Sequence, residues 1–219
     1  MKTLRFPAAL AGLTLLAACA QVPPATRAAT EVTALDEIVV SGAPAVTQPR
    51  YDVRDVRVTV PRTLHVSEAN LYYPIADLVW RGDARGDRYA QVSEIFTEAA
   101  DRATAQMHAG RPVSVDIEVL RFHALTEKTR YSVGGSYGVK FSLTVRDAQT
   151  GALIDGPRVV KAGHPASGGQ KAIDEEARGL TEKVVVTQFL DNLLRAELAK
   201  PGVPAAAAED RISLLGLGQ

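Results

Sequence analysis

One five-residue motif in the sequence has the spacing of a catalytic nucleophile. Ser136 is the central serine of Gly134-Gly135-Ser136-Tyr137-Gly138, which matches the G-x-S-x-G nucleophile elbow of serine hydrolases. That elbow requires a strand before it and a helix after it, so that the serine lies in a strained, exposed turn. Here the residues that follow alternate between apolar and polar, which predicts a strand instead. We interpret the motif as a glycine-rich loop leading into a strand, and a serine hydrolase using Ser136 is the less favoured alternative.

The histidines do not point to a metal site or to a catalytic partner for this serine. His65, His108, His123 and His164 are scattered along the sequence. None has a second His, Cys or carboxylate at metal-ligand spacing on the same expected element. The sequence therefore predicts no metal, no cofactor and no catalytic residue set, and we expect a protein that is not an enzyme.

Trp80 to Arg88 is the most unusual charged stretch, and it contains the only tryptophan. Three arginines surround Asp83 and Asp87, which should hold both carboxylates ionised and salt-bridged. An ion-paired structural loop is the favoured interpretation. Because loops on rigid scaffolds often carry binding, a partner-contact loop is the alternative. The residues that would contact a partner are Trp80, Arg81, Asp83, Arg85, Asp87 and Arg88.

Cys19, the only cysteine, follows a segment typical of a secretory signal. Met1–Arg5 carries two positive charges, the next 11 or so residues are almost wholly apolar, and small residues precede the cysteine. Leu16-Ala17-Ala18-Cys19 resembles the lipobox of bacterial lipoproteins. The resemblance implies that a signal peptide, residues 1–18, is removed and that Cys19 receives acyl chains such as palmitate.

The same segment predicts where the protein is held. Its apolar run is shorter than the roughly 20 residues that a membrane-spanning helix needs, so the acyl chains would provide the attachment to the membrane. Ala20, rather than an aspartate, follows the cysteine. By resemblance to bacterial lipoprotein sorting, this favours the periplasmic face of the outer membrane, with the inner membrane as the alternative.

The composition limits the class of partner. The sequence holds 25 Lys and Arg against 25 Asp and Glu, which predicts a surface of nearly balanced charge. Nucleic acid is therefore not an expected partner. With Cys19 acylated, no thiol is left for a disulfide, so packing must stabilise the fold.

Proline-rich segments predict the domain boundaries. Residues 19–50 are rich in Ala, Pro, Thr and Val and indicate a flexible tether, and residues 201–219 indicate a flexible tail. One globular domain, residues 51–200, remains between them. Leu35–Ser41 within the tether resembles the TonB box, which pairs with an energising protein by strand addition. Such a contact would run through Ile38, Val39 and Val40, and the alternative is a short strand that pairs with the protein's own domain.

Hydrophobic periodicity predicts the elements of this domain. Alternating residues predict strands at 55–60, 113–119, 137–145 and 153–162, and 77–80 is a candidate short strand. Apolar spacing of three and four predicts one helix that begins at the N-cap Asp87 and stops before Gly110 and Pro112. The same spacing predicts a second, uninterrupted long helix over 173–198. Because each strand has one polar face, we predict an α+β two-layer sandwich, in which two long helices pack on one face of a small antiparallel or mixed sheet.

Several short runs in the first half of this domain resemble an uncharacterised lipoprotein family of alphaproteobacteria. These runs are Val60-Pro61, Val66–Asn70, Asp77–Asp83, Gly86-Asp87-Arg88, Gln91-Val92 and Ile95-Phe96. More distantly, the element order and the lipobox are similar to small envelope lipoproteins of the lipopolysaccharide-assembly and intermembrane-lipid-transport accessory type. That similarity implies a protein that plugs or braces a partner.

Together these features predict a lipid-anchored envelope lipoprotein with a non-catalytic binding or accessory domain. Its partner would be an envelope protein or a lipid-like ligand. A purely structural lipoprotein that supports envelope integrity is the alternative.

Overall fold

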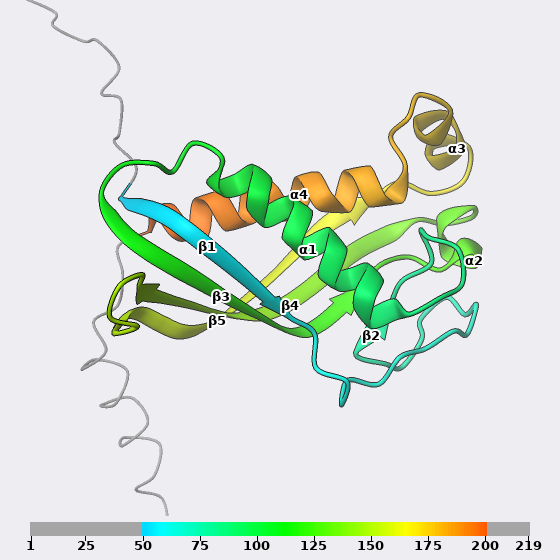
Figure 1. Cartoon of the computed structure of the whole chain (residues 1–219). Coiled ribbons are helices and arrows are strands. Elements are labelled where there is room, and N and C mark those ends of the chain that lie inside the picture. The colour runs from blue at the N-terminus through cyan, green and yellow to red at the C-terminus, as the bar shows by residue number, and fades with distance from the viewer. Residues whose placement is uncertain (1–49, 201–219) are drawn as a thin grey trace, which may run out of the picture. The chain divides into compact units, whose positions relative to one another are not determined.

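In the computed structural model, residues 50–200 are described, and they form a mixed five-stranded sheet with two long helices on one face (Figure 1). About a third of the domain is helical and a third is strand. The predicted α+β sandwich is therefore confirmed, and the sheet is mixed. Cys19, the TonB-like residues 38–40 and the tail 201–219 lie outside the described residues.

The strands run in the order β1-β3-β4-β5. β1 (Tyr51–Thr59) pairs in parallel with β3 (Arg111–His123). β4 (Gly135–Asp147) and β5 (Leu153–Ala166) continue the sheet as antiparallel neighbours. The candidate short strand is present as β2 (Leu78–Val79), which pairs in parallel with the last two residues of β3. All the predicted strands are thus confirmed, and β1, β3, β4 and β5 are longer than expected.

The two long helices are α1 (Arg88–Thr104) and α4 (Glu182–Ala199), which lie together on the same side of the sheet in Figure 1. Asp87 caps α1 as predicted, because its side chain accepts hydrogen bonds from the N–H groups of Tyr89 and Ala90. Two short helices follow β3 and β5, namely α2 (Glu127–Arg130) and α3 (Gln170–Ala177).

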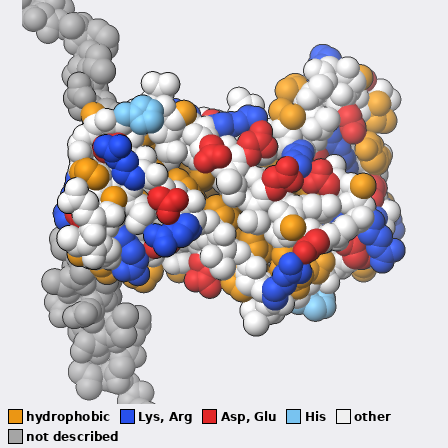
Figure 2. Space-filling view, in the orientation of Figure 1, with side chains coloured by type: hydrophobic (Ala, Val, Ile, Leu, Met, Phe, Trp, Pro, Cys, Tyr) orange, Lys and Arg blue, Asp and Glu red, His pale blue; other side chains and the backbone are white. Residues whose placement is uncertain are grey.

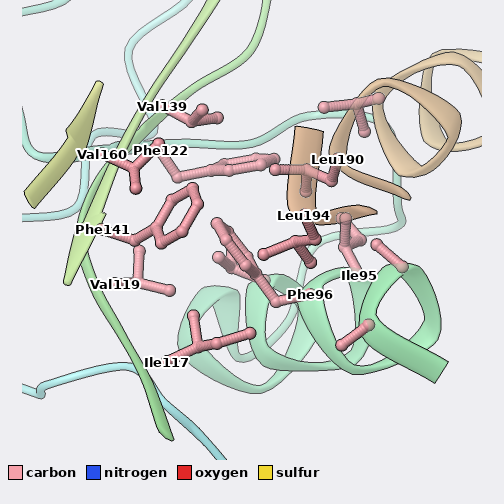
Figure 3. Close-up of a cluster of buried hydrophobic side chains, with 14 of the residues drawn as sticks. Ile95, Phe96, Ile117, Val119, Phe122, Val139, Phe141, Val160, Leu190 and Leu194 are labelled. Carbon is pink, nitrogen blue, oxygen red and sulfur yellow. The ribbon is translucent and has the colours of Figure 1, made fainter. Parts of the chain in front are cut away.

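The core lies between this helix pair and the sheet (Figure 3). Phe96 of α1 meets Phe122 of β3 and Phe141 of β4 edge to face, with ring centroids 6.0 and 5.7 Å apart. Leu190 and Leu194 of α4 close the cluster from the other helix. Since alternate strand residues supply the core, the residues between them face away from the helices.

The predicted C-terminal end of the first long helix and the continuity of the second are wrong, whereas the second helix ends at Ala199 as expected. α1 ends at Thr104 with Ala105 as its cap, and Gly110 instead occupies a left-handed turn (φ 97°) just before β3. The helix predicted over 173–198 is interrupted, because Gly179 adopts φ 84° and Thr181 starts α4 by accepting the N–H of Val184. The apolar spacing continues through this break, so periodicity alone could not locate it.

The two ends of the described chain meet at one end of the domain. The Arg50 guanidinium donates to the backbone oxygen of Lys200 at 3.0 Å. β2, α2 and the segment before β2 lie at the opposite end (Figure 1). Within residues 50–200, no helix is both long enough and apolar enough to cross a membrane.

Phe122→Ala should destabilise the domain by about 3–5 kcal/mol, because it removes a ring that packs between Trp80 and Phe96 and leaves a cavity. Chemical denaturation measures the change. Ile75→Ala is the control, since 93% of Ile75 is exposed and its truncation should change the unfolding free energy by less than about 0.5 kcal/mol. Equal losses from both substitutions would contradict this account of the core.

Candidate functional site

The face of the sheet that the helices leave uncovered carries its charges in two different arrangements. Near β1, Asp116 lies between two arginines: its carboxylate oxygens are 3.2 Å from Nε of Arg57 and 3.2 Å from Nε of Arg146. Each cation there has a carboxylate partner across the strands, which is the favourable arrangement for a sheet surface. The helix-bearing side is similarly mixed, with charges of both signs interspersed in Figure 2.

Toward the β2 end of the same face, three cations lie in a row. Arg121 of β3 is directly opposite Lys140 of β4, and Lys140 is directly opposite Lys161 of β5. Among the described residues, no carboxylate forms a salt bridge with any of the three. Like charges in directly opposite positions destabilise a sheet, so this row is an unfavourable feature that the domain retains.

A cavity of about 670 Å³ opens beside this row. Arg121, Lys140 and Lys161 line one part of it, while Tyr72, Tyr73 and Val133 line another. Gly135 and Gly138, from the glycine-rich motif, form part of its wall. Its volume is in the range of small-molecule binding sites.

The segment Leu71–Ile75 holds large exposed apolar side chains, and Tyr72, Tyr73 and Pro74 of this segment line the cavity. Tyr73 is 78% exposed and Ile75 is 93% exposed, and Leu71 and Tyr72 are also more than half exposed. The backbone of the segment is nevertheless fixed. The hydroxyls of Thr126 and Thr129 donate to the backbone oxygens of Leu71 and Tyr72, at 2.8 and 3.2 Å. The fold therefore presents these side chains to solvent from an anchored backbone, which is a feature of interaction sites.

His123 connects the segment to the basic row. Its Nε2 donates to the backbone oxygen of Ala76 at 2.6 Å, which leaves Nδ1 to accept from Arg121 at 3.3 Å. Burial lowers the pKa of His123, and the Arg121 guanidinium lowers it further against the opposing effects of Ala76 and Asp77. His123 is therefore uncharged at neutral pH, and its two hydrogen bonds fix the orientation of its ring in the cavity wall.

Ser136 lies inside β4, so the strand–turn–helix context of a nucleophile elbow is not formed. Ser136 and His123 line the same cavity. However, both ring nitrogens of His123 bond other groups, as described above, and no hydrogen bond joins the histidine to Ser136. His164 stacks between Tyr137 and Phe189. No nucleophile–base pair is assembled around Ser136 in the described domain.

The loop from Trp80 to Arg88 is closely ion-paired. Trp80 is fully buried and its indole N–H donates to Asp83 at 2.8 Å. Arg81 bridges Glu68 (2.9 Å) and Glu127 (2.8 Å). Arg88, only 4% exposed, donates to the other carboxylate oxygen of Glu68 at 2.6 Å.

The favoured interpretation of this loop thus agrees with its geometry. Asp87 pairs with Arg62 at 2.6 Å in addition to capping α1. Asp83 lies 3.4 Å from the ammonium of Lys183. Trp80 and Arg88 are too buried to meet a partner, and among the six candidates Arg85 and Asp87 are exposed. Partner contact through this loop stays a prediction for its exposed residues.

A second, smaller cavity of about 230 Å³ lies beside this ion-paired loop. Its wall includes two buried charged residues that the periodicity did not single out, Arg130 and Glu182. Glu182 accepts a hydrogen bond from the N–H of Leu125 at 2.9 Å. Burial raises the pKa of Glu182 to about 7, although that hydrogen bond and Arg130 oppose the shift. Over residues 50–200, no group of His, Cys, Asp and Glu side chains is arranged to hold a metal ion.

The fold and site define an α+β domain with one helix-covered sheet face and one open face that carries an uncompensated basic row. The chain belongs to a family of unknown function (DUF6778), whose model matches residues 51–213. The expected membership of an uncharacterised family is thus confirmed, and its description names no activity. No curated protein matches the chain by sequence.

Solved structures with a similar arrangement are distant. A Xanthomonas campestris protein of family DUF330 has 15% identity and a TM-score of 0.44, with 71% of this chain and 87% of that chain covered. A candidate lipoprotein from Caulobacter crescentus has 13% identity and a TM-score of 0.32, with 67% and 93% covered. A hypothetical protein from Chlamydia trachomatis has 11% identity and a TM-score of 0.33, with 69% and 95% covered. We draw nothing about function from likeness at this level.

Glu182→Gln should remove a pH dependence of stability. Because the folded state keeps the Glu182 proton up to a pKa of about 7 and the unfolded state loses it near 4.5, the contribution of this residue to stability falls as pH rises between these values. Relative to Glu182→Gln, the unmodified protein should lose up to about 3 kcal/mol from pH 4.5 to pH 8. Denaturation of both proteins across this range measures the difference.

The glutamine keeps an oxygen that can accept from Leu125, so the comparison isolates the charge. Parallel stability curves for the two proteins would contradict the assignment of a buried proton to Glu182.

Proposed function

We propose that this chain is a lipid-anchored envelope protein whose domain binds a partner and catalyses no reaction. The observation that carries the proposal is the anchored, exposed segment 71–75 beside an open cavity and a row of unpaired cations. Aromatic and aliphatic side chains in solvent next to uncompensated charge are unfavourable for an isolated protein and favourable for one that binds. The ion pairs and hydrogen bonds of the remaining groups serve the fold.

The anchor in this proposal is Cys19, supported by the signal-like segment and the lipobox-like residues before it. The outer membrane is the proposed address, on the grounds of Ala20. Residue 50, where a tether would join the domain, lies at the end opposite to segment 71–75. A domain attached there would present its cavity away from the attachment point.

The proposed partner is an envelope protein or a lipid-like ligand. The resemblance to small accessory lipoproteins of lipopolysaccharide assembly and intermembrane lipid transport is in keeping with either. A structural lipoprotein that only supports envelope integrity would have no use for a cavity with an anchored apolar rim, so we favour the binding role.

Cys19→Ser should abolish acylation and release the protein from the membrane fraction into the soluble periplasmic fraction, because the thiol is the acylation point of a lipobox. Metabolic labelling with a palmitate analogue and cell fractionation measure both effects. Ala20→Asp is the matched control: it keeps the label and should move the protein to the inner membrane. Labelling of the Cys19→Ser protein would overturn the anchor.

A photoreactive phenylalanine analogue in place of Tyr73 should give a discrete crosslinked product in living cells, because Tyr73 is 78% exposed at the cavity mouth. The same analogue at Ile173, an exposed apolar residue of α3, should give none. Gel mobility and mass spectrometry of the product distinguish a protein from a lipid adduct. Identical patterns from the two positions would count against a binding role for this end of the domain.

A further inference from the structure

No carboxylate of the described domain forms a salt bridge with the basic row at the cavity. Arg121, Lys140 and Lys161 are cross-strand neighbours, and each is exposed. At the β1 end of the same face, Asp116 compensates two arginines. The sheet is therefore able to balance its charges, and at the cavity it does not. An anion bound there would supply the missing partner for all three cations.

Other charged groups at the cavity do not cancel this row. Asp77 lines the cavity, but its carboxylate accepts the N–H of His65 at 2.9 Å and forms no salt bridge with the row. The Lys128 ammonium adds a positive charge at the mouth, where it lies 4.5 Å from the ring centroid of Tyr72. Among the described side chains that line the cavity, three are cationic, and Asp77 is the one carboxylate.

The rest of the cavity is suited to hydrocarbon. Tyr72, Tyr73 and Val133 form its rim, and Leu120, Leu125 and Val139 also line it. A volume of about 670 Å³ accommodates a headgroup together with part of an acyl chain. A soluble anion would use the cations but leave this apolar rim in water, whereas an amphiphile would cover both.

We propose that this cavity binds a single phosphate-bearing anionic lipid, with its headgroup on Arg121, Lys140 and Lys161 and its acyl chain against Tyr72, Tyr73 and Val133. The inference rests on the proposed binding function and narrows its partner to one class. The ligand is one lipid molecule and not a membrane surface. The cations lie on the sheet beside the cavity, whereas a membrane would be contacted by the exposed segment 71–75.

Gly138 offers a way to close the cavity without disturbing the sheet. It lies on β4 and lines the cavity, and a Cβ placed on it would have only the Cβ of His123 within contact range, at 4.0 Å. Gly138→Leu should therefore fold and fill the site. Lys140→Gln with Lys161→Gln removes the charge of two exposed side chains. Lys171→Gln on α3 makes the same chemical change away from the cavity and is the matched control.

The test uses the full chain carrying Cys19→Ser and two monomeric probes, lysophosphatidylglycerol and lysophosphatidylcholine of equal chain length, with titration calorimetry. The anionic probe should bind at least roughly tenfold more tightly than the zwitterionic one. Gly138→Leu should abolish binding of both probes. The double lysine variant should bind the anionic probe roughly tenfold more weakly and should no longer prefer it over the zwitterionic probe. Lys171→Gln should change neither affinity.

Absence of binding, or binding that all these variants leave unchanged, would overturn the proposal. Binding only to phosphatidylglycerol vesicles, lost with Ile75→Ser but kept with Gly138→Leu, would show a membrane-contact surface instead and would also overturn it. Glycerol 3-phosphate binding as tightly as the lysolipid would assign the site to a soluble anion.

If Gly138→Leu fails to fold, the lysine variants decide the outcome. Acylation of Cys19 and crosslinking at Tyr73 are measured separately. A negative result in the lipid-binding test would therefore leave the proposed envelope-binding function to be decided by those two experiments.

Discussion

A β-bulge in β3 determines which side chains reach the open face of the sheet. Val113, Val115, Ile117 and Val119 alternate toward the helices, and unbroken alternation would place Arg121 and His123 in the core as well. The pairing with β4 shifts between Val119 and Arg121, so that Leu120 is the extra residue. After the shift Phe122 faces the helices, and Arg121 and His123 face away. One inserted residue thus places Phe122 in the aromatic core and Arg121 in the basic row.

Because the bulge changes which residues of β3 face away from the helices, this strand contributes side chains of opposite charge near the two ends of the open face. Before the bulge, β3 contributes Asp116 to the open face, and neighbouring strands supply arginines to it. After the bulge, β3 contributes Arg121, and β4 and β5 contribute Lys140 and Lys161. A sheet surface gains from the first arrangement and loses from the second. The loss is tolerated because the core on the other face, built around Phe96, Phe122 and Phe141, stabilises the domain independently of the open face.

Sequence patterns predicted the layer architecture and the five strands of the described domain, because one-sided burial imposes a period of two on strands and a period near 3.6 on helices. They failed at Gly179, where the chain leaves the helix while its apolar spacing continues. The candidate site was missed for a different reason. Arg121, Lys140 and Lys161 become neighbours only through the registers of two strand pairs, and the bulge at Leu120 sets one of those registers. The exposure of Leu71–Ile75 also depends on tertiary contacts, although four large apolar residues around one proline were a usable signal.

The ion-paired loop from Trp80 to Arg88 positions the exposed segment 71–75 indirectly, through α2. Arg81 joins Glu68, which precedes segment 71–75, to Glu127 of α2. α2 and its cap in turn provide Thr129 and Thr126, whose hydroxyls hold the backbone of that segment. Isolated surface ion pairs contribute little, but a half-buried guanidinium between two carboxylates fixes the distance between the parts it joins. The charges that are most conspicuous in the sequence therefore position the exposed segment, and the unpaired cations beside the cavity are the ones available to a ligand.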